Sequence, residues 1–257
     1  MGDELLCTVA DGVGTVTLNR PAKRNALNRA LLDGLAASFE RLEGDPAVRV
    51  VVLRGAGPAF CAGMDLDDLA RQQDAQADPE ASVLTVLGRI EQCRHPTLAV
   101  VHGDAFAGGL ELALHCDLRV AVEHARFAMP LARLGLVVPF ALGQKLVEIV
   151  GPAMARQLLM VGRPLTARRA YEIGMVHEVT PAAELERVVG EVTRTIAANA
   201  PLSLQGMKQT ILRALAPREG IAHADLDTLA AQARRSRDAR EGVRAMLEKR
   251  TPDFRGE

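Results

Sequence analysis

The chain has 257 residues, of which 48% are hydrophobic and 25% are charged, a composition typical of a globular protein with a sizeable core. Its net charge of −1, one tyrosine and no tryptophan argue against a nucleic-acid partner, and no apolar run approaches membrane-spanning length. The first residues, Met1-Gly2-Asp3-Glu4, lack the pattern of a signal peptide. We therefore expect a cytoplasmic protein with no nucleic-acid partner and no membrane insertion.

The first part of the chain alternates strand and helix patterns. Alternating apolar residues over 5–18 predict a β-hairpin, and the valine run over 48–53 predicts a buried central strand. Between them, Asn28 is a suitable N-cap for an amphipathic helix. The polar stretch 72–80 is expected to be a mobile surface segment, and a helix is expected from there to Arg94.

The later part of the chain continues the alternation and then changes to helices alone. Strands are expected over 97–101, 118–122 and 176–179, and helices around 110–114, 142–149 and 185–196. From residue 200 onward no strand pattern occurs. The sequence thus predicts an α/β fold, with a core over residues 1–199 and a helical region over 200–257.

Two loops rich in small residues each follow a predicted strand and lead into a helix. They cover residues 55–66 and 102–109. Gly108 and Gly109 fall where the second loop becomes the first turn of a helix, whose backbone N–H groups have no intrahelical acceptor. Glycine also lets a ligand oxygen approach the backbone closely. We expect each loop to direct a backbone N–H at a ligand.

Glu111 follows within the first turn of that helix. Its carboxylate could act on a molecule bound over Gly108, as a general acid or base. An acidic residue in a first helical turn also complements the helix dipole without any chemical role. The residues alone leave both interpretations open.

The cysteines and the common cofactor motifs give no sign of a metal or a nucleotide. The four cysteines are scattered, without a C-x-x-C pair, and are expected to be reduced core residues: Cys7, Cys61, Cys93 and Cys116. The triplet His115-Cys116-Asp117 is too compact for common metal-ligand spacing. Neither G-x-G-x-x-G, nor a P-loop, nor G-x-S-x-G occurs. We expect no metal site.

Several motifs occur in a characteristic order over nearly the whole chain. They are Leu18-Asn19-Arg20-Pro21, Phe60-Cys61-Ala62-Gly63-Met64-Asp65-Leu66, Ala107-Gly108-Gly109-Leu110-Glu111-Leu112-Ala113 and Arg240-Glu241-Gly242. In this order they resemble the crotonase family, the enoyl-CoA hydratases and isomerases. The resemblance implies a crotonase-like spiral of ββα units with a C-terminal helical region, 200–257, for trimer assembly, and usually a hexamer.

The resemblance also implies the ligand and its binding residues. The ligand is an acyl-CoA thioester, as in fatty acid metabolism, and no separate cofactor is expected because CoA is part of the substrate. The thioester carbonyl is expected between the backbone N–H groups of Met64 and Gly108, with Glu111 as a catalytic glutamate. Arg24 matches a basic position near the CoA phosphates, and Lys249 a lysine that reaches a neighbouring subunit's CoA. The other expected substrate-binding residues are Ala26, Ala62, Asp65, Leu66, Gly109 and Leu131.

The sequence departs from the family pattern at three places. Leu131 stands where the hydratases carry their second catalytic glutamate, and a leucine side chain can neither give nor take a proton. Residues 138–143 replace the usual glycine-rich segment, and Asp67 stands where many hydratases carry a lysine. Arg133 and His102 flank the expected site and are interpreted as structural.

Three functions fit this pattern. The first is a hydratase or double-bond isomerase with a single acid/base glutamate, Glu111. The second is another enolate reaction, such as decarboxylation of a malonyl-type thioester, which needs no strong base. The third is a non-catalytic acyl-CoA binding protein. The first is favoured by the resemblance.

Overall fold

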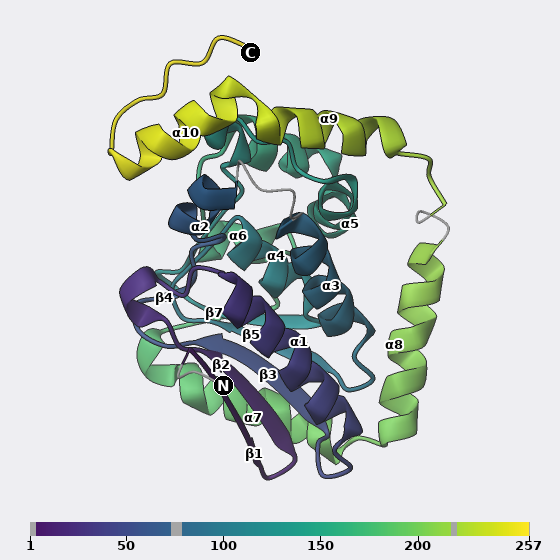
Figure 1. The fold of residues 1–257 in the computed structure, drawn as a ribbon. Coiled ribbons are helices and arrows are strands. Elements are labelled where there is room, and N and C mark those ends of the chain that lie inside the picture. The colour runs from purple at the N-terminus through teal and green to yellow at the C-terminus, as the bar shows by residue number, and fades with distance from the viewer. Residues whose placement is uncertain (1–3, 73–78, 217–219, 257) are drawn as a thin grey trace.

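The computed structural model describes residues 4–72, 79–216 and 220–256. Among these residues the strands form two sheets (Figure 1). The larger has the order β1-β2-β3-β5-β7-β10, with β1 (Leu5–Ala10), β2 (Val13–Leu18), β3 (Val50–Gly55), β5 (Thr97–Val101), β7 (Leu118–Val122) and β10 (Glu178–Thr180). The smaller has the order β4-β6-β8-β9, with β4 (Ala59–Cys61), β6 (Asp104–Phe106), β8 (Arg126–Ala128) and β9 (Leu165–Thr166).

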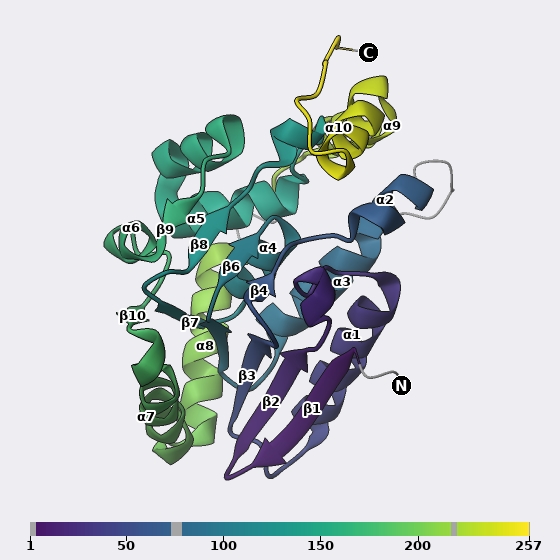
Figure 2. The ribbon, with the colours of Figure 1, turned by 90° about the vertical axis from the view of Figure 1, so that its left-hand side faces the viewer.

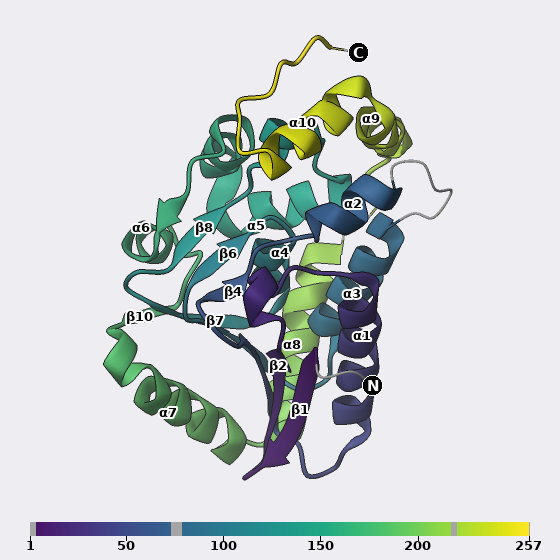
Figure 3. The same ribbon diagram turned by 60° about the vertical axis from the view of Figure 1, so that its left-hand side comes forward.

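Helices cover both faces of the larger sheet. The α-helices are α1 (Arg29–Gly44), α2 (Leu66–Gln72), α3 (Pro79–Gln92), α4 (Gly108–His115), α5 (Phe140–Arg156), α6 (Ala167–Glu172), α7 (Leu185–Ala198), α8 (Pro201–Leu215), α9 (Ala224–Arg235) and α10 (Arg237–Leu247). Helix α7 lies on one side of the sheet and α1 with α3 on the other (Figure 3). The first four residues of β3 are buried, as expected for a strand covered on both faces.

The chain repeats one unit three times, in which a strand of each sheet is followed by a helix. The units are β3-β4-α2, β5-β6-α4 and β7-β8-α5. Within each sheet these strands pair in parallel, so the units wind in one direction (Figure 2). This is the spiral of ββα units that the sequence predicts.

Most of the predicted elements agree with the structure. The hairpin of β1 and β2 is antiparallel, and the Asn28 side chain accepts a hydrogen bond from the Leu31 N–H at 2.8 Å. The last predicted core strand is displaced, since β10 covers 178–180 instead of 176–179. Of the polar segment 72–80, residues 73–78 lie outside the described residues.

Two sequence predictions need correction. The loops 55–66 and 102–109 each contain a strand of the smaller sheet, β4 or β6, because three residues paired in a sheet are too few to show an alternating pattern. The region 200–257 is also not helical throughout: helix α10 ends at Leu247, and 248–256 follow without helical structure.

The C-terminal helices lie over the spiral instead of apart from it (Figure 1). Helix α10 contacts α2 and the short 3₁₀-helix η2 (Leu131–Leu134). A Cβ atom on Gly242 would come within 2.6 Å of the Leu134 backbone, so glycine allows this close approach. No helix among the described residues is long and apolar enough to cross a membrane.

Candidate active site

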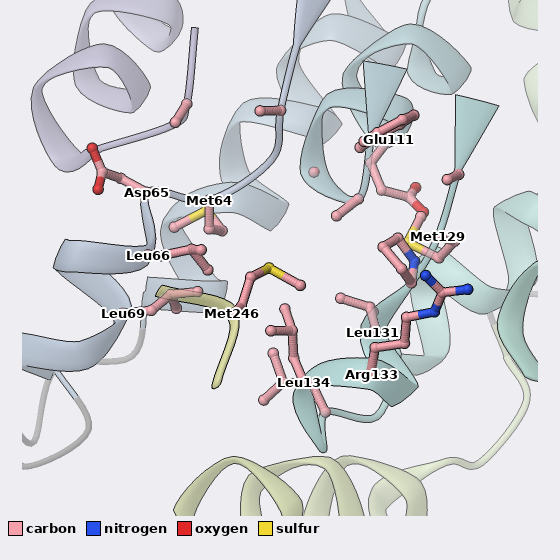
Figure 4. Close-up of a pocket in the computed structure, with 18 of the residues that line it drawn as sticks. Met64, Asp65, Leu66, Leu69, Glu111, Met129, Leu131, Arg133, Leu134 and Met246 are labelled. Atoms are coloured by element: carbon pink, nitrogen blue, oxygen red, sulfur yellow. The ribbon is translucent and has the colours of Figure 1, made fainter. Parts of the chain in front are cut away.

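A cavity of about 590 Å³ lies where the ββα units meet α10. One side comes from the residues that precede α2 and α4, and the other from η2 and the start of α5 (Figure 4). Met246 of α10 reaches in between the two sides, and Leu247, Ala230 and Arg234 complete this part of the wall. The cavity therefore draws on residues from Lys23 to Leu247.

The two small-residue loops meet at the cavity. A Cβ atom on Gly63 would lie 3.4 Å from the Gly108 nitrogen, and one on Gly108 would lie 3.9 Å from the Met64 nitrogen. Among the described residues, neither the Met64 N–H nor the Gly108 N–H has a protein acceptor. Ala107, which precedes Gly108, has φ +47°, a strained conformation for alanine that fixes the direction of the Gly108 N–H.

Neighbouring groups hold both loops in place. The buried Asn25 amide donates hydrogen bonds to the carbonyl oxygens of Ala56, Ala59 and Phe60 at 2.8–3.2 Å. A Cβ atom on Gly109 would lie 2.2 Å from the Cys61 carbonyl oxygen, so only glycine lets α4 approach β4 this closely. The loops are thus set before any ligand binds.

Glu111 is almost completely buried and lines the cavity, where its carboxyl group points toward Met129 (Figure 4). Neither of its carboxyl oxygens has a hydrogen-bond partner among the described residues, although most buried polar atoms have one. It therefore caps no N–H of its own helix. Burial raises the pKa of Glu111 from 4.5 to about 8, and the positive charge of Lys145 opposes that rise.

A group of ionisable side chains lies behind Glu111, on the side away from the cavity. The His115 Nδ1 atom is 3.7 Å from Glu111 Oε2 and 2.8 Å from the Glu111 carbonyl oxygen, to which it donates a hydrogen bond. Burial lowers the pKa of His115 to about 4, which keeps this imidazole neutral at pH 7. Lys145 forms ion pairs with Glu91 and, at 3.2 Å, with Glu148.

The opposite side of the cavity is almost entirely apolar. The residues that form it are Met129, Pro130, Leu131, Leu134, Leu136, Val137, Pro139 and Leu142. Leu131 belongs to this apolar side, and the Met129 side chain lies between it and Glu111 in Figure 4. A leucine side chain offers this part of the site no proton donor or acceptor.

Many of the predicted site residues come together here. The cavity wall includes the three predicted catalytic positions, Met64, Gly108 and Glu111, and five predicted substrate-binding residues, Ala26, Ala62, Asp65, Leu66 and Leu131. The Asp65 carboxylate is paired with Arg20 at 2.9 Å, and it accepts the Asp67 N–H at 3.1 Å. The Asp65 side chain therefore connects the loop after β4 with the segment that contains Arg20.

Three other predicted binding residues lie outside the cavity wall. Gly109 serves the contact between α4 and β4. Arg24 is exposed and accepts the Ala62 N–H with its carbonyl oxygen, while the neighbouring Lys23 lines the cavity and pairs with Asp67 at 2.7 Å. Lys249 is exposed after α10, where a role toward a second subunit stays a prediction.

The structure also shows where the remaining residues singled out from the sequence lie relative to the cavity. Arg133, which is interpreted as structural from the sequence, lines the cavity. His102 lies outside the cavity wall, where its Nε2 atom is 3.0 Å from the Gly57 carbonyl oxygen. Of the triplet 115–117, the side chain of Asp117 pairs with Lys208 at 2.8 Å. The cysteines are free, and all but Cys7 are buried. Met246 and Leu247 were missed because no local pattern links a C-terminal helix to a distant cavity.

Comparisons with known proteins decide the family. The model of the enoyl-CoA hydratase/isomerase family matches residues 8–257. The chain belongs to this family. A 2,3-dehydroadipyl-CoA hydratase of Escherichia coli is 36% identical over 256 residues, which cover 98% of this chain and 99% of that protein. A short-chain-enoyl-CoA hydratase of Clostridium acetobutylicum is 33% identical, over 93% of this chain and 92% of that one.

Solved structures of similar proteins have the same fold. An enoyl-CoA hydratase/isomerase from Pseudoalteromonas atlantica superposes with a TM-score of 0.86 at 34% identity, over 98% of this chain and 100% of that one. A methylmalonyl-CoA decarboxylase complexed with 2S-carboxypropyl-CoA gives a TM-score of 0.90 at 25% identity over both whole chains. Together with the family match, these likenesses make the chain a hydratase/isomerase-like enzyme of acyl-CoA thioesters with the crotonase fold.

Proposed function

We propose that this enzyme performs a hydratase or isomerase reaction in which Glu111 alone transfers the proton. The observation that carries the proposal is the buried Glu111 carboxyl group, which lines the cavity without a hydrogen-bond partner among the described residues. A buried polar group without a partner costs stability, so its presence calls for a functional reason. In this site that reason is proton transfer to or from a substrate carbon.

The thioester carbonyl is placed by this proposal between the N–H groups of Met64 and Gly108. Both N–H groups lack an acceptor among the described residues, and they lie on adjoining loops. Proton removal from the carbon next to the carbonyl, or addition at the next carbon, moves negative charge onto that oxygen. Fixed N–H donors stabilise this charge at about 3–4 kcal/mol each, without reorganising. CoA enters as part of the substrate, so the reaction needs no separate cofactor.

Glu111 must be ionised to accept a proton and protonated to donate one. In isomerisation its carboxylate takes a proton from one carbon of the substrate and returns it to another. In hydration it takes the proton of a water that adds to the β-carbon and then delivers a proton to the α-carbon. Because Leu131 cannot hold that water, hydration is expected to be slower than with two glutamates.

Decarboxylation is the weaker candidate. Its support is the likeness in fold to a methylmalonyl-CoA decarboxylase, at 25% identity, and the apolar Leu131. The relatives named as hydratases are more similar, at 33% and 36% identity. Turnover of crotonyl-CoA without turnover of methylmalonyl-CoA would support the proposal. The reverse result would replace it, and turnover of neither with saturable binding would identify an acyl-CoA binding protein.

The proposed assembly is a trimer or hexamer formed through the C-terminal region. Leu202, Met207 and Ile211 of α8 are 81%, 63% and 61% exposed, an unusual position for large apolar side chains. Light scattering at micromolar concentration should therefore give a mass of three or six chains, and a monomer would contradict this part of the proposal. In such an assembly Lys249 is the residue proposed to reach a neighbouring subunit's CoA, and Arg24 the one near the phosphates.

A further inference from the structure

Arg133 differs from the other cationic residues of the cavity wall, Lys23 and Arg234, in having no partner among the described residues. Lys23 is paired with Asp67, Asp65 is paired with Arg20, and Arg234 also has an interaction. The Arg133 guanidinium forms no hydrogen bond and no ion pair with the described residues. This cation therefore stands without a counter-charge at the edge of an apolar cavity wall.

The surroundings of Arg133 place it on the acyl side of the proposed site. It follows Leu131 by two residues in η2 and lies beside Leu131 and Met129 in Figure 4, opposite Asp65. The Gly162 backbone lies beside the Arg133 side chain, since a Cβ atom on Gly162 would lie 3.5 Å from Arg133 Nε. If the thioester is bound at Met64 and Gly108, the CoA extends toward Asp65 and Lys23, and the acyl chain extends toward Leu131 and Arg133.

We propose that Arg133 binds a carboxylate at the far end of the acyl chain, so that the enzyme prefers CoA thioesters of dicarboxylic acids. The planar guanidinium matches a carboxylate in a two-point hydrogen-bonded pair. The apolar residues between Glu111 and Arg133 suit the methylene groups that would separate the two ends of such a chain. This inference rests on the proposed function, because it takes the orientation of the thioester from it.

Binding of saturated acyl-CoA pairs tests the inference without any catalytic step. Hexanoyl-CoA and adipoyl-CoA have chains of the same length and differ in a terminal methyl against a carboxylate; pentanoyl-CoA and glutaryl-CoA form a second pair. In at least one of the two pairs, calorimetry at low ionic strength should show that the dicarboxylic thioester binds about tenfold more tightly than the monocarboxylic thioester of the same length. Because Arg133 is exposed, added salt should reduce this preference.

Substitutions of Arg133 then assign the preference to this residue. In Arg133→Leu the preference for the dicarboxylic thioester should disappear while hexanoyl-CoA binds as before, and Arg133→Lys should keep part of it. Arg163→Leu is the matched control. It removes the same charge from an exposed residue between Gly162 and Pro164, outside the cavity wall, and should leave the preference intact.

Each other outcome overturns the inference in a recognisable way. Equal weakening of both thioesters in Arg133→Leu would show that the guanidinium contacts the CoA portion. Equal or tighter binding of hexanoyl-CoA to the unaltered protein would show that the acyl end takes no carboxylate. Failure to bind any of the four thioesters would instead overturn the proposed acyl-CoA site itself.

Discussion

The side of the cavity that comes from β4, β6 and α4 presents two backbone N–H groups and a carboxyl group, whereas the side from η2 and α5 presents mainly hydrocarbon. The first side is made largely of main chain, held by Asn25 and by the close contact of Gly109 with Cys61. The second is made of side chains that one substitution can change. Under the proposed function, the first side would activate the thioester, and the second would decide which reaction and which acyl chain follow.

The largest expected effect comes from removing the carboxyl group proposed to transfer the proton. Glu111→Gln keeps the size of the side chain but can neither take nor give the proton, so turnover should fall by about 10²–10⁴-fold. Steady-state kinetics with crotonyl-CoA measures this loss. Acyl-CoA binding should survive, because the N–H donors remain. Activity unchanged in this variant would mean that other residues carry the chemistry.

The same variant also has a consequence for stability. The pKa of Glu111 is raised to about 8 in the folded state, against 4.5 in the unfolded chain. The folded protein therefore holds a proton that the unfolded chain releases between these values, and stability should decline as pH rises from 4.5 to 8. Chemical denaturation of Glu111→Gln at several pH values should lack this part of the decline.

The second effect removes one backbone donor from the polar side. Met64→Pro deletes an N–H that has no protein acceptor among the described residues, and Gly63 before it has no Cβ to clash with the proline ring. The loss should be about 10²–10³-fold in kcat. Met64→Ala is the matched control, since it shortens the side chain but retains the N–H. An equal loss in both variants would locate the effect in the side chain and not in the donor.

The third effect adds a polar group to the apolar side. Leu131→Glu places a carboxyl group at the position where the family resemblance implies a second catalytic glutamate, and hydration of crotonyl-CoA should rise by about tenfold or more. The new group would be partly desolvated, which raises its pKa and leaves it able to donate a proton. Leu131→Met serves as a control for packing. No gain in the glutamate variant would show that the rest of the apolar side also excludes the water.

The smallest expected effect comes from changing the pKa of Glu111 through Lys145, which does not line the cavity. Because proton removal requires the ionised carboxylate, activity should rise with pH up to about 8, the pKa of Glu111, and then level off. Lys145 opposes the rise in that pKa, so Lys145→Met should move the profile to higher pH and reduce the rate at pH 7 a few-fold. Lys145→Arg keeps the positive charge and should leave the profile in place.

The sequence predicted the parts of this site that depend on local pattern and on the family motifs. The loops around Met64 and Gly108, the position of Glu111 and the apolar residue 131 all follow from short contiguous motifs. The motifs did not show that Glu111 is buried without a partner, because burial depends on how distant segments pack. For the same reason the motifs did not show that Arg133 lines the cavity, since its setting depends on η2, Gly162 and α10 together.

The contribution of Met246 and Leu247 to the cavity has a consequence for the coupling between ligand binding and the packing of α10. Helix α10 spans the two sides through its contacts with α2 and η2, so an acyl-CoA bound in the cavity would contact both the spiral and α10. Ligand binding and the docking of α10 must then favour each other to the same extent. The amides of α10 should therefore exchange with solvent more slowly when an acyl-CoA is bound than in the free protein.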